Sequence, residues 1–511
     1  MTEISTGASF TAKAVARNSA ANAFRTLSAF ALGFIVPPLL IRWLPEKEYA
    51  AFILCSRVAA FFILLDAGMQ ITVTRKCAEG LSSGDTGLVA GILHEALRII
   101  RRLVLVGVLI LVVVTTQLHS IFSEIDSTVV LRAQICLVLF AGSSLFALLL
   151  SPYNAVLVAG NQTSRLALRT VLFRVAAALA IIVAAATGSG IVVVSAISAG
   201  ASFLVAAQAI PLARRSFPWL KTSPRIRNSQ LARTVAKQSG LFATITLTQF
   251  LINSLDVAIV GRIDYDRIVA YSLCVTVVTG LETLHHGLMQ PALPTLSAAR
   301  KVLDDVDFAA AMRRWNLLVS GYWALMCFGL FVSAPVFLRL WVGQSMSDTA
   351  TPVLRLLLLG YFTRYADWTY GTSVIASNYF RKIMFSPILI AFIHLTMTIT
   401  IGQPFGAIGV AAGTAIAAFL GIAFTATISM RITRKLVPVQ VVPYFLDSLG
   451  YPLLIAGPLG LLSLMFGEPG LMNFLALTAI ALFGCTALLS VQARSYPWHA
   501  VARLRAMRAE G

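Results

Sequence analysis

The chain has 511 residues, of which 58% are hydrophobic and only 12% are charged, and its formal net charge is +19. A soluble globular protein has about 25% charged residues, so this composition excludes an ordinary soluble protein. Apolar runs of roughly 20 residues recur along the whole length, and each can cross a hydrocarbon core about 30 Å thick. We therefore predict an all-α polytopic membrane protein.

Taken in chain order, the apolar runs predict about 14 transmembrane helices. Residues 1–17 are mostly small and polar, and the first apolar run leads directly to others, so we expect an uncleaved signal-anchor. Short links at 187–190, 402–406 and 466–470 turn the chain on one side. The expected spans are centred near residues 31, 62, 109, 146, 179, 200, 250, 282, 328, 364, 393, 418, 457 and 479.

The Lys and Arg residues predict the orientation of the chain. Most of the 40 lie on the side of the N-terminus, and two, Arg57 and Arg364, fall within expected spans. Cytoplasmic loops concentrate Lys and Arg, so both termini are expected in the cytoplasm. The same rule, with contact to anionic membrane lipids, accounts for the basic segment 213–233. No nucleic-acid motif is present, and nucleic acid is not predicted as a partner.

The sequence shows signs of an internal repeat at an offset of 220 residues. The matches are VARNS at 15–19 with VAKQS at 235–239, MQ at 69–70 with MQ at 289–290, and Phe30 with Phe250. Six expected spans separate equivalent points, so the two copies face the same way, as parallel repeats do. Chance agreement between apolar sequences is the alternative. The repeat predicts an N-terminal six-helix lobe at 1–220, a C-terminal six-helix lobe at 221–437, and two additional helices with a basic tail at 438–511.

Polar residues inside the first, second and seventh expected spans suggest a path through the membrane. An ionisable group in the bilayer interior costs at least a few kcal/mol unless it is paired or solvated, so such groups should face the bundle interior or a water-filled cavity. The second span carries Arg57 and Asp66, nine residues apart and on opposite helix faces. The first span carries Asn18, Asn22 and Arg25 at i, i+4 and i+7, and the seventh carries Gln249, Asn253 and Asp256 at the same spacing.

Two further spans carry the densest polar sets. In the eighth, Glu282 can reach a histidine three or four residues later; the histidines are His285 and His286. The tenth carries an aromatic stripe with a charge pair; its members are Tyr361, Arg364, Tyr365 and Trp368, with Asp367 at the edge. One interpretation is a polar cleft that binds an anionic, hydroxyl-rich ligand. The other is interhelical contact, in which the charges only neutralise each other.

Two stretches resemble a known family. The first, at 44–80, has a Tyr after a short acidic loop, an Asp-x-Gly element, and an Arg with an Ala-Glu pair; these are Tyr49, Asp66, Gly68, Arg75, Ala78 and Glu79. The second, at 250–274, contains Asp256, Gly261 and the pair Tyr271-Ser272. They resemble the opening hairpin and the seventh span of Wzx-like polysaccharide (O-antigen) flippases. These flippases belong to the multidrug/oligosaccharidyl-lipid/polysaccharide exporter superfamily.

The resemblance implies a non-enzymatic exporter in the bacterial inner membrane, with two six-helix bundles around a V-shaped cleft. Its cargo would be an undecaprenyl-pyrophosphate-linked oligosaccharide for lipopolysaccharide, O-antigen or exopolysaccharide, moved by alternating access. A polysaccharide polymerase and chain-length machinery are the implied partners. The substrate-binding residues would be Arg25, Arg57 and Arg364 for phosphate and Tyr361, Tyr365 and Trp368 for sugars, with Asp367 beside them. Candidates for ion coupling are Asp66, Asp256, Glu282, His285 and His286.

Two alternatives remain at this point. A multidrug exporter of the same fold would prefer cationic drugs, and the arginines argue against that cargo. A membrane polymerase or glycosyltransferase needs a large periplasmic loop, whereas the longest link on that side spans only about 15 residues near 118–132. The six cysteines show no metal-ligand spacing, and no cofactor is expected.

Overall fold

The computed structural model describes residues 12–66, 68–221, 229–289, 292–377, 379–434 and 437–454. Within these ranges all regular elements are helices, which confirms the predicted all-α class. Eight of the described helices are long and apolar enough to cross a membrane, and the chain is a multi-pass membrane protein. The total of 14 spans stays a prediction. The expected spans near 457 and 479 and the turn at 466–470 lie outside the described residues.

The chain divides into two compact units, Met1–Ser272 and Leu273–Gly511, each described by itself. The boundary falls within a single helix, α12 (Ile268–Met289). Compact units are defined by packing, and lobes are defined by the repeat. The predicted lobe boundary between residues 220 and 221 therefore stays a prediction.

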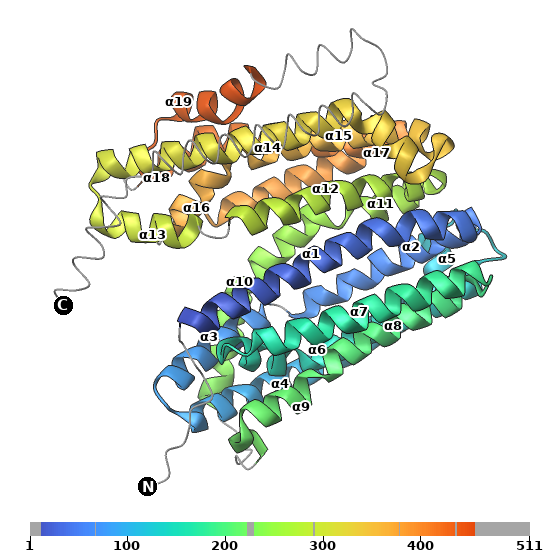
Figure 1. Ribbon diagram of the computed structural model, residues 1–511, viewed down its shortest axis with the longest axis horizontal. Coiled ribbons are helices and arrows are strands. Elements are labelled where there is room, and N and C mark those ends of the chain that lie inside the picture. Colours follow the sequence, from blue (N-terminus) through green and yellow to red (C-terminus); the bar gives the residue numbers. More distant parts are fainter. Residues whose placement is uncertain are drawn as a thin grey trace. The chain divides into compact units, whose positions relative to one another are not determined.

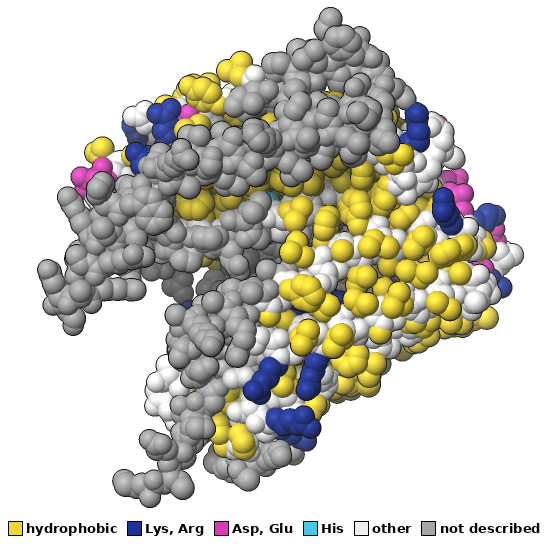
Figure 2. Space-filling model, in the orientation of Figure 1, with side chains coloured by type: hydrophobic (Ala, Val, Ile, Leu, Met, Phe, Trp, Pro, Cys, Tyr) yellow, Lys and Arg dark blue, Asp and Glu magenta, His cyan; other side chains and the backbone are white. Residues whose placement is uncertain are grey.

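The first unit is built around α6, which packs against α2, α3, α4, α8 and α9 (Figure 1). The side chains of Ile92, Leu137 and Leu157 are fully buried there. Other large apolar side chains point outward, and Figure 2 shows a face on which such side chains predominate, as lipid contact requires. The elements of this unit are α1 (Ala12–Trp43), α2 (Glu46–Ala60), η1 (Phe61–Asp66), α3 (Met69–Ser82), α4 (Thr86–Thr116), α5 (Leu118–Ile121), α6 (Val130–Ala159), α7 (Thr163–Ala186), α8 (Gly190–Ala207), α9 (Ala209–Ser216), η2 (Pro218–Lys221), α10 (Ser229–Asn253), α11 (Asp256–Ile263) and η3 (Tyr265–Arg267).

In the second unit, α15 packs against both α14 and α17 (Figure 1). Two π-helical turns, η6 and η7, interrupt the α-helical pattern near the end of the described chain. Besides α12, the elements are α13 (Ala292–Val302), α14 (Asp305–Val342), α15 (Gln344–Arg364), η4 (Tyr365–Asp367), α16 (Trp368–Ala376), η5 (Phe380–Ile383), α17 (Phe385–Phe424), η6 (Thr425–Ser429), α18 (Met430–Thr433), α19 (Val441–Phe445) and η7 (Leu446–Gly450).

Glycines in the left-handed backbone region occur at both described short links. Gly188 and Gly190 have φ of 74° and 72°, and they separate α7 from α8. Gly406 has φ of 59° and divides α17 into two arms. Only glycine adopts this region readily, so these turns depend on the residue type that the sequence supplies.

Two long helices of the described chain begin in a similar way, and the parallel repeat stays a prediction. Helix α4 begins at Thr86 and α14 begins 219 residues later, at Asp305. Each is preceded by an aspartate cap: the side chain of Asp85 accepts a hydrogen bond from the Leu88 amide, and that of Asp304 from the Asp307 amide, both at 2.8 Å. The two helices therefore start 219 residues apart, one residue off the predicted offset of 220, and they have the same N-cap chemistry.

At one end of the first unit, carboxylates form contacts that connect neighbouring helices. Glu48 on α2 accepts hydrogen bonds from Arg132 on α6 and, at 3.3 Å, from the backbone amide of Ile191 on α8. Nearby, Lys47 lies 2.7 Å from Asp126, and this hydrogen bond holds the pKa of the Asp126 carboxyl below its usual value. These contacts fix the relative positions of three helices at the end where α2 begins.

The two arms of α17 approach so closely at Gly413 that a larger residue should be destabilising. A Cβ atom there would lie 2.6 Å from the Met397 carbonyl oxygen and 2.8 Å from the Cα of Thr398, and backbone atoms cannot rotate away. We expect Gly413→Ala to cost about 1–3 kcal/mol of stability, seen as a lower apparent melting temperature in detergent.

Gly371, in α16, is the matched control because a Cβ there would meet no atom within 4 Å. Gly371→Ala should leave the melting temperature unchanged or raise it slightly, since alanine favours the helix. Equal melting temperatures for the two variants would contradict the close approach at Gly413.

Candidate functional site

The second unit holds a compact polar cluster in which one tyrosine joins an acid and a histidine. The Tyr365 hydroxyl donates a hydrogen bond to Glu282 Oε1 at 2.6 Å. The same hydroxyl lies 3.1 Å from His286 Nε2, and the His286 Nε2 to Glu282 Oε1 distance is 3.9 Å. The side chain of His286 is 57% exposed and that of Glu282 only 13%. The cluster therefore runs from an accessible imidazole to a mostly buried carboxyl.

Local helix geometry produces this arrangement. Glu282 and His286 stand four residues apart on α12, so one turn places them on the same face. Tyr365 comes directly after the end of α15, in the short 3-10 segment η4. The sequence predicts a continuous span here, whereas the structure changes helix type at η4. It ends the α-helix at Arg364 and restarts it at Trp368.

Aromatic rings surround the neighbouring His285. Its ring centroid lies 4.9 Å from that of Trp323, 4.5 Å from that of Tyr365 and 5.3 Å from that of Trp368. His285 Nδ1 forms a hydrogen bond with the Tyr322 hydroxyl. The buried Nε2 of His285 has no hydrogen-bond partner within the described part of the chain. The result is a largely apolar wall with few polar atoms beside Glu282.

Arg364 supplies the positive charge of the cluster. Its guanidinium carbon lies 5.6 Å from the centroid of the Tyr361 ring, a cation–π arrangement. Electrostatic attraction acts between Arg364 and two carboxyls, Glu282 and Asp367. Asp367 also accepts a hydrogen bond from the Thr425 hydroxyl of η6 at 2.9 Å. Both carboxyls therefore have partners, and the arginine lies close enough to interact with each.

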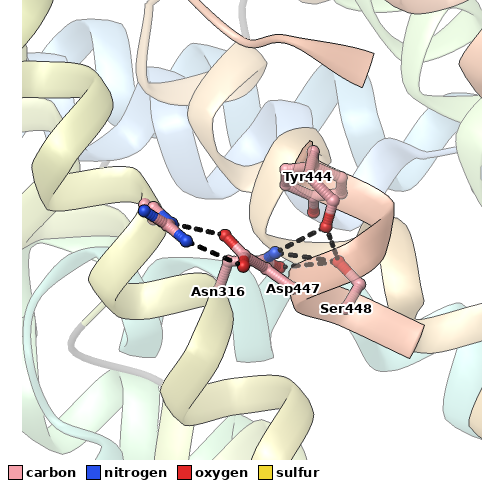
Figure 3. A network of polar contacts seen from close by, with 5 residues as sticks. Asn316, Tyr444, Asp447 and Ser448 are labelled. Carbon is pink, nitrogen blue, oxygen red and sulfur yellow. Dashed lines mark hydrogen bonds and ion pairs between the residues drawn. The ribbon is translucent and has the colours of Figure 1, made fainter. Parts of the chain in front are cut away.

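A second polar network attaches the last described helical segment to α14 (Figure 3). Arg313 donates two hydrogen bonds to Asp447, from Nε at 2.7 Å and from a terminal nitrogen at 3.2 Å. Asn316 Nδ2 donates to Ser448 Oγ at 2.8 Å and to the Tyr444 carbonyl at 3.2 Å. The Tyr444 hydroxyl in turn accepts from the backbone amide at the start of α16, so the network reaches the segment that follows η4.

The candidates in the first unit have separate surroundings. Asp66 accepts hydrogen bonds from the Ser151 hydroxyl at 3.2 Å and from a backbone amide of α3 at 3.1 Å. Asp256 accepts from the Tyr271 hydroxyl at 3.3 Å and is buried. Arg25 is exposed on α1, close enough to Arg174 for their charges to interact.

Arg57 is half-buried on α2. The structure thus brings together the candidates of the eighth and tenth expected spans, all within the second unit. The four candidates of the first unit do not form one such cluster. Among the residues that the structure describes, no group of three His, Cys, Asp or Glu side chains could hold a metal ion.

Sequence reasoning missed several members of these networks. Tyr322, Trp323 and Thr425 come from α14 and η6, far from the polar spans in sequence, and single aromatic or hydroxyl residues carry no signal in an apolar run. Asp447 does carry a signal in the sequence, because it is a lone carboxyl next to an apolar stretch. Its partner Arg313 lies 134 residues earlier, so the pairing needs the fold.

Comparisons with known proteins support the fold. No protein-family model matches the sequence, and no curated protein matches it. The lipid II flippase MurJ, in an inward closed conformation, matches with a TM-score of 0.70 and 15% identity over 94% of this chain and 99% of that chain. A multidrug resistance MATE family transporter of the MOP superfamily, in an inward-facing conformation, matches with a TM-score of 0.58 and 18% identity over 80% and 94%. The chain therefore has the fold that these two transporters share.

The Arg313–Asp447 contact should contribute measurably to stability. The Asp447 side chain is 3% exposed and that of Arg313 is 61% exposed, so solvent weakens one end of the pair. A hydrogen bond to a charged group contributes about 1.5–3 kcal/mol, and we expect Asp447→Ala to cost an amount near the lower end. The measurement is the apparent melting temperature of the purified protein.

Asp348 is the matched control. It is exposed near the start of α15 and accepts a hydrogen bond from the exposed Gln344. Asp348→Ala removes the same charge and should change stability by no more than about 0.5 kcal/mol. If Asp447→Ala melts at the temperature of Asp348→Ala, the network does not hold the segment in place.

Proposed function

We propose that this protein is a flippase that moves an undecaprenyl-pyrophosphate-linked oligosaccharide across the bacterial inner membrane. Its likeness to the fold of a lipid II flippase supports a lipid-linked cargo, and MATE transporters with the same fold also carry cargo across membranes. The observation that carries the proposal is the guanidinium of Arg364, which lies beside the Tyr361 ring within the tenth expected span. An arginine in such a place needs a reason, because burying its charge is costly.

The chemistry of the cluster suits a sugar-pyrophosphate headgroup. A guanidinium binds phosphate oxygens in bidentate geometry, so Arg364 would hold the pyrophosphate. The aromatic side chains of Tyr361, Tyr365 and Trp368 present apolar ring faces on which sugars stack. Asp367 would orient Arg364 and accept hydrogen bonds from sugar hydroxyls. Arg25 and Arg57 would be further phosphate partners in the first unit.

Alternating access is the mechanism that we propose for this chain. Parallel repeats related by an axis along the membrane normal are typical of transporters that rock one half against the other. With both termini in the cytoplasm, the headgroup would enter from the cytoplasmic side and leave on the periplasmic side. The lipid tail would stay in the bilayer. A polysaccharide polymerase with its chain-length machinery would then use the product for O-antigen, lipopolysaccharide or exopolysaccharide.

A multidrug exporter is the second candidate function. The specific observation in its favour is that the cluster also holds two carboxyls, Glu282 and Asp367, beside aromatic rings, and this combination suits a cationic aromatic drug. The two functions differ in the role of Arg364. Removing this positive charge should strengthen the binding of a cationic drug. It should weaken the binding of a pyrophosphate, which loses its partner.

Arg364→Ala should therefore lower the rate of headgroup translocation at least tenfold, because one lost bidentate phosphate contact is worth at least about 1.4 kcal/mol. The assay follows a labelled undecaprenyl-pyrophosphate oligosaccharide in proteoliposomes at matched protein level. Faster efflux of a cationic dye by this variant, with no lipid translocation by the wild type, would favour the drug exporter.

Arg355 provides the matched control on the same helix. Its guanidinium lies 5.4 Å from the Phe331 ring centroid, and its Nε donates to the Phe331 carbonyl at 3.2 Å, away from the cluster. Arg355→Ala should translocate the headgroup at a rate near that of the wild type. Equal losses in both variants would mean that the arginines act through stability rather than through cargo.

A further inference from the structure

We propose that Glu282 takes up a proton when the anionic headgroup binds, through the hydrogen-bond chain that Tyr365 forms with His286. This inference rests on the proposed function, since it concerns the same cluster and names the ion that is bound together with the cargo. It assigns one residue and one route within the set of candidates for ion coupling.

The geometry provides an unbroken route for a proton. His286 is the exposed end and Glu282 the buried end, and the Tyr365 hydroxyl is within hydrogen-bond distance of both, at 3.1 Å and 2.6 Å. The direct His286 to Glu282 distance of 3.9 Å is too long for a hydrogen bond, so the hydroxyl is the connecting atom. Tyr365 sits at this point because the α-helix ends one residue earlier.

The transfer conserves protons and charge. A protonated His286 gives its Nε2 hydrogen to the Tyr365 oxygen while the Tyr365 hydroxyl hydrogen passes to Glu282 Oε1. One N–H bond and one O–H bond break, and two O–H bonds form. The imidazole ends neutral, the tyrosine remains a neutral hydroxyl, and the carboxylate becomes a carboxylic acid. His286 is exposed, so a proton from water can recharge it.

The charges around Glu282 determine how its protonation affects the binding of the headgroup. Several titratable or charged groups face the Glu282 site among the described residues of the second unit. They are His285 and His286 on α12, Tyr322 on α14 beside His285, Tyr361 and Arg364 on α15, and Tyr365 on η4. Of these, Arg364 is the one fixed positive charge, and it is attracted to the Glu282 carboxylate.

A charged Glu282 carboxylate competes with the phosphate for Arg364, and its negative charge also repels the phosphate. Once Glu282 is neutral, both effects are removed. Asp367 differs, because it accepts a hydrogen bond from Thr425 and does not belong to the hydrogen-bond chain. Protonation of Glu282 must therefore strengthen anion binding, and by thermodynamic reciprocity a bound headgroup must raise the proton affinity of Glu282.

The test measures proton uptake directly. The full chain in detergent, in weakly buffered solution at neutral pH with a pH-indicator dye, is mixed with undecaprenyl pyrophosphate, and binding is measured in parallel. The lipid itself titrates, so the readout is the difference between wild type and Glu282→Gln. We expect wild type to take up a measurable fraction of a proton per bound lipid in excess of the variant. We also expect the affinity of the variant to depend less on pH.

Control variants distinguish proton uptake at Glu282 from proton uptake elsewhere in the protein. Asp348→Asn removes a carboxylate from an exposed position on α15 and should take up protons as the wild type does. Tyr365→Phe removes the connecting hydroxyl and should slow proton uptake per bound lipid, with binding measured in parallel. Equal uptake by wild type and Glu282→Gln would overturn the inference and leave the proposed function intact. Failure of wild type to bind the lipid would overturn both.

Discussion

Lipid hydrocarbon offers no hydrogen bonds, so each charge inside an apolar helical bundle has to find its partners within the protein. The structure meets this constraint with short-range pairs. Asp447 takes two hydrogen bonds from Arg313, Asp66 is bonded to Ser151, and Glu282 is bonded to Tyr365. Because these partners lie on different helices, satisfying the charges also fixes which helices lie side by side. The contacts that offset the cost of placing charges in the bundle therefore also fix the relative positions of the helices.

Departures from the α-helix coincide with these polar residues. The 3-10 segment η4 contains Asp367, the π-helical turn η6 begins with Thr425, and the π-helical turn η7 contains Asp447. A change of helical pitch rotates the following side chains relative to the preceding ones, which aims a polar group at a partner that a regular helix would miss. Such turns inside helices are often found at functional sites. In this chain, all three turns lie in the second unit, and each contains a residue of a polar network.

The parts that the sequence could predict are those with local signals. The all-α class follows from composition, the turns at Gly188 and Gly406 from short glycine-containing links, and the Glu282–His286 contact from their spacing of four residues. The partners that were missed come from distant segments: Tyr322 reaches His285 across 37 residues of sequence and Thr425 reaches Asp367 across 58. No periodicity reports such pairs, because only the packing of whole helices brings them together. The end of α15 at Arg364 was also invisible, since neither glycine nor proline marks it.

The predicted repeat relates His286 to a residue of the first half of the chain. His286 stands 220 residues after Asp66, and the same dipeptide, MQ, follows three residues later in each copy. In the first copy the α-helical pattern breaks before this position, and Asp66 ends η1; in the second copy α12 runs past it to Met289. At the offset of the predicted repeat, the chain thus carries an acid in the first half and a base in the second. On the predicted repeat, the two halves of the chain therefore differ here both in backbone conformation and in the type of ionisable side chain.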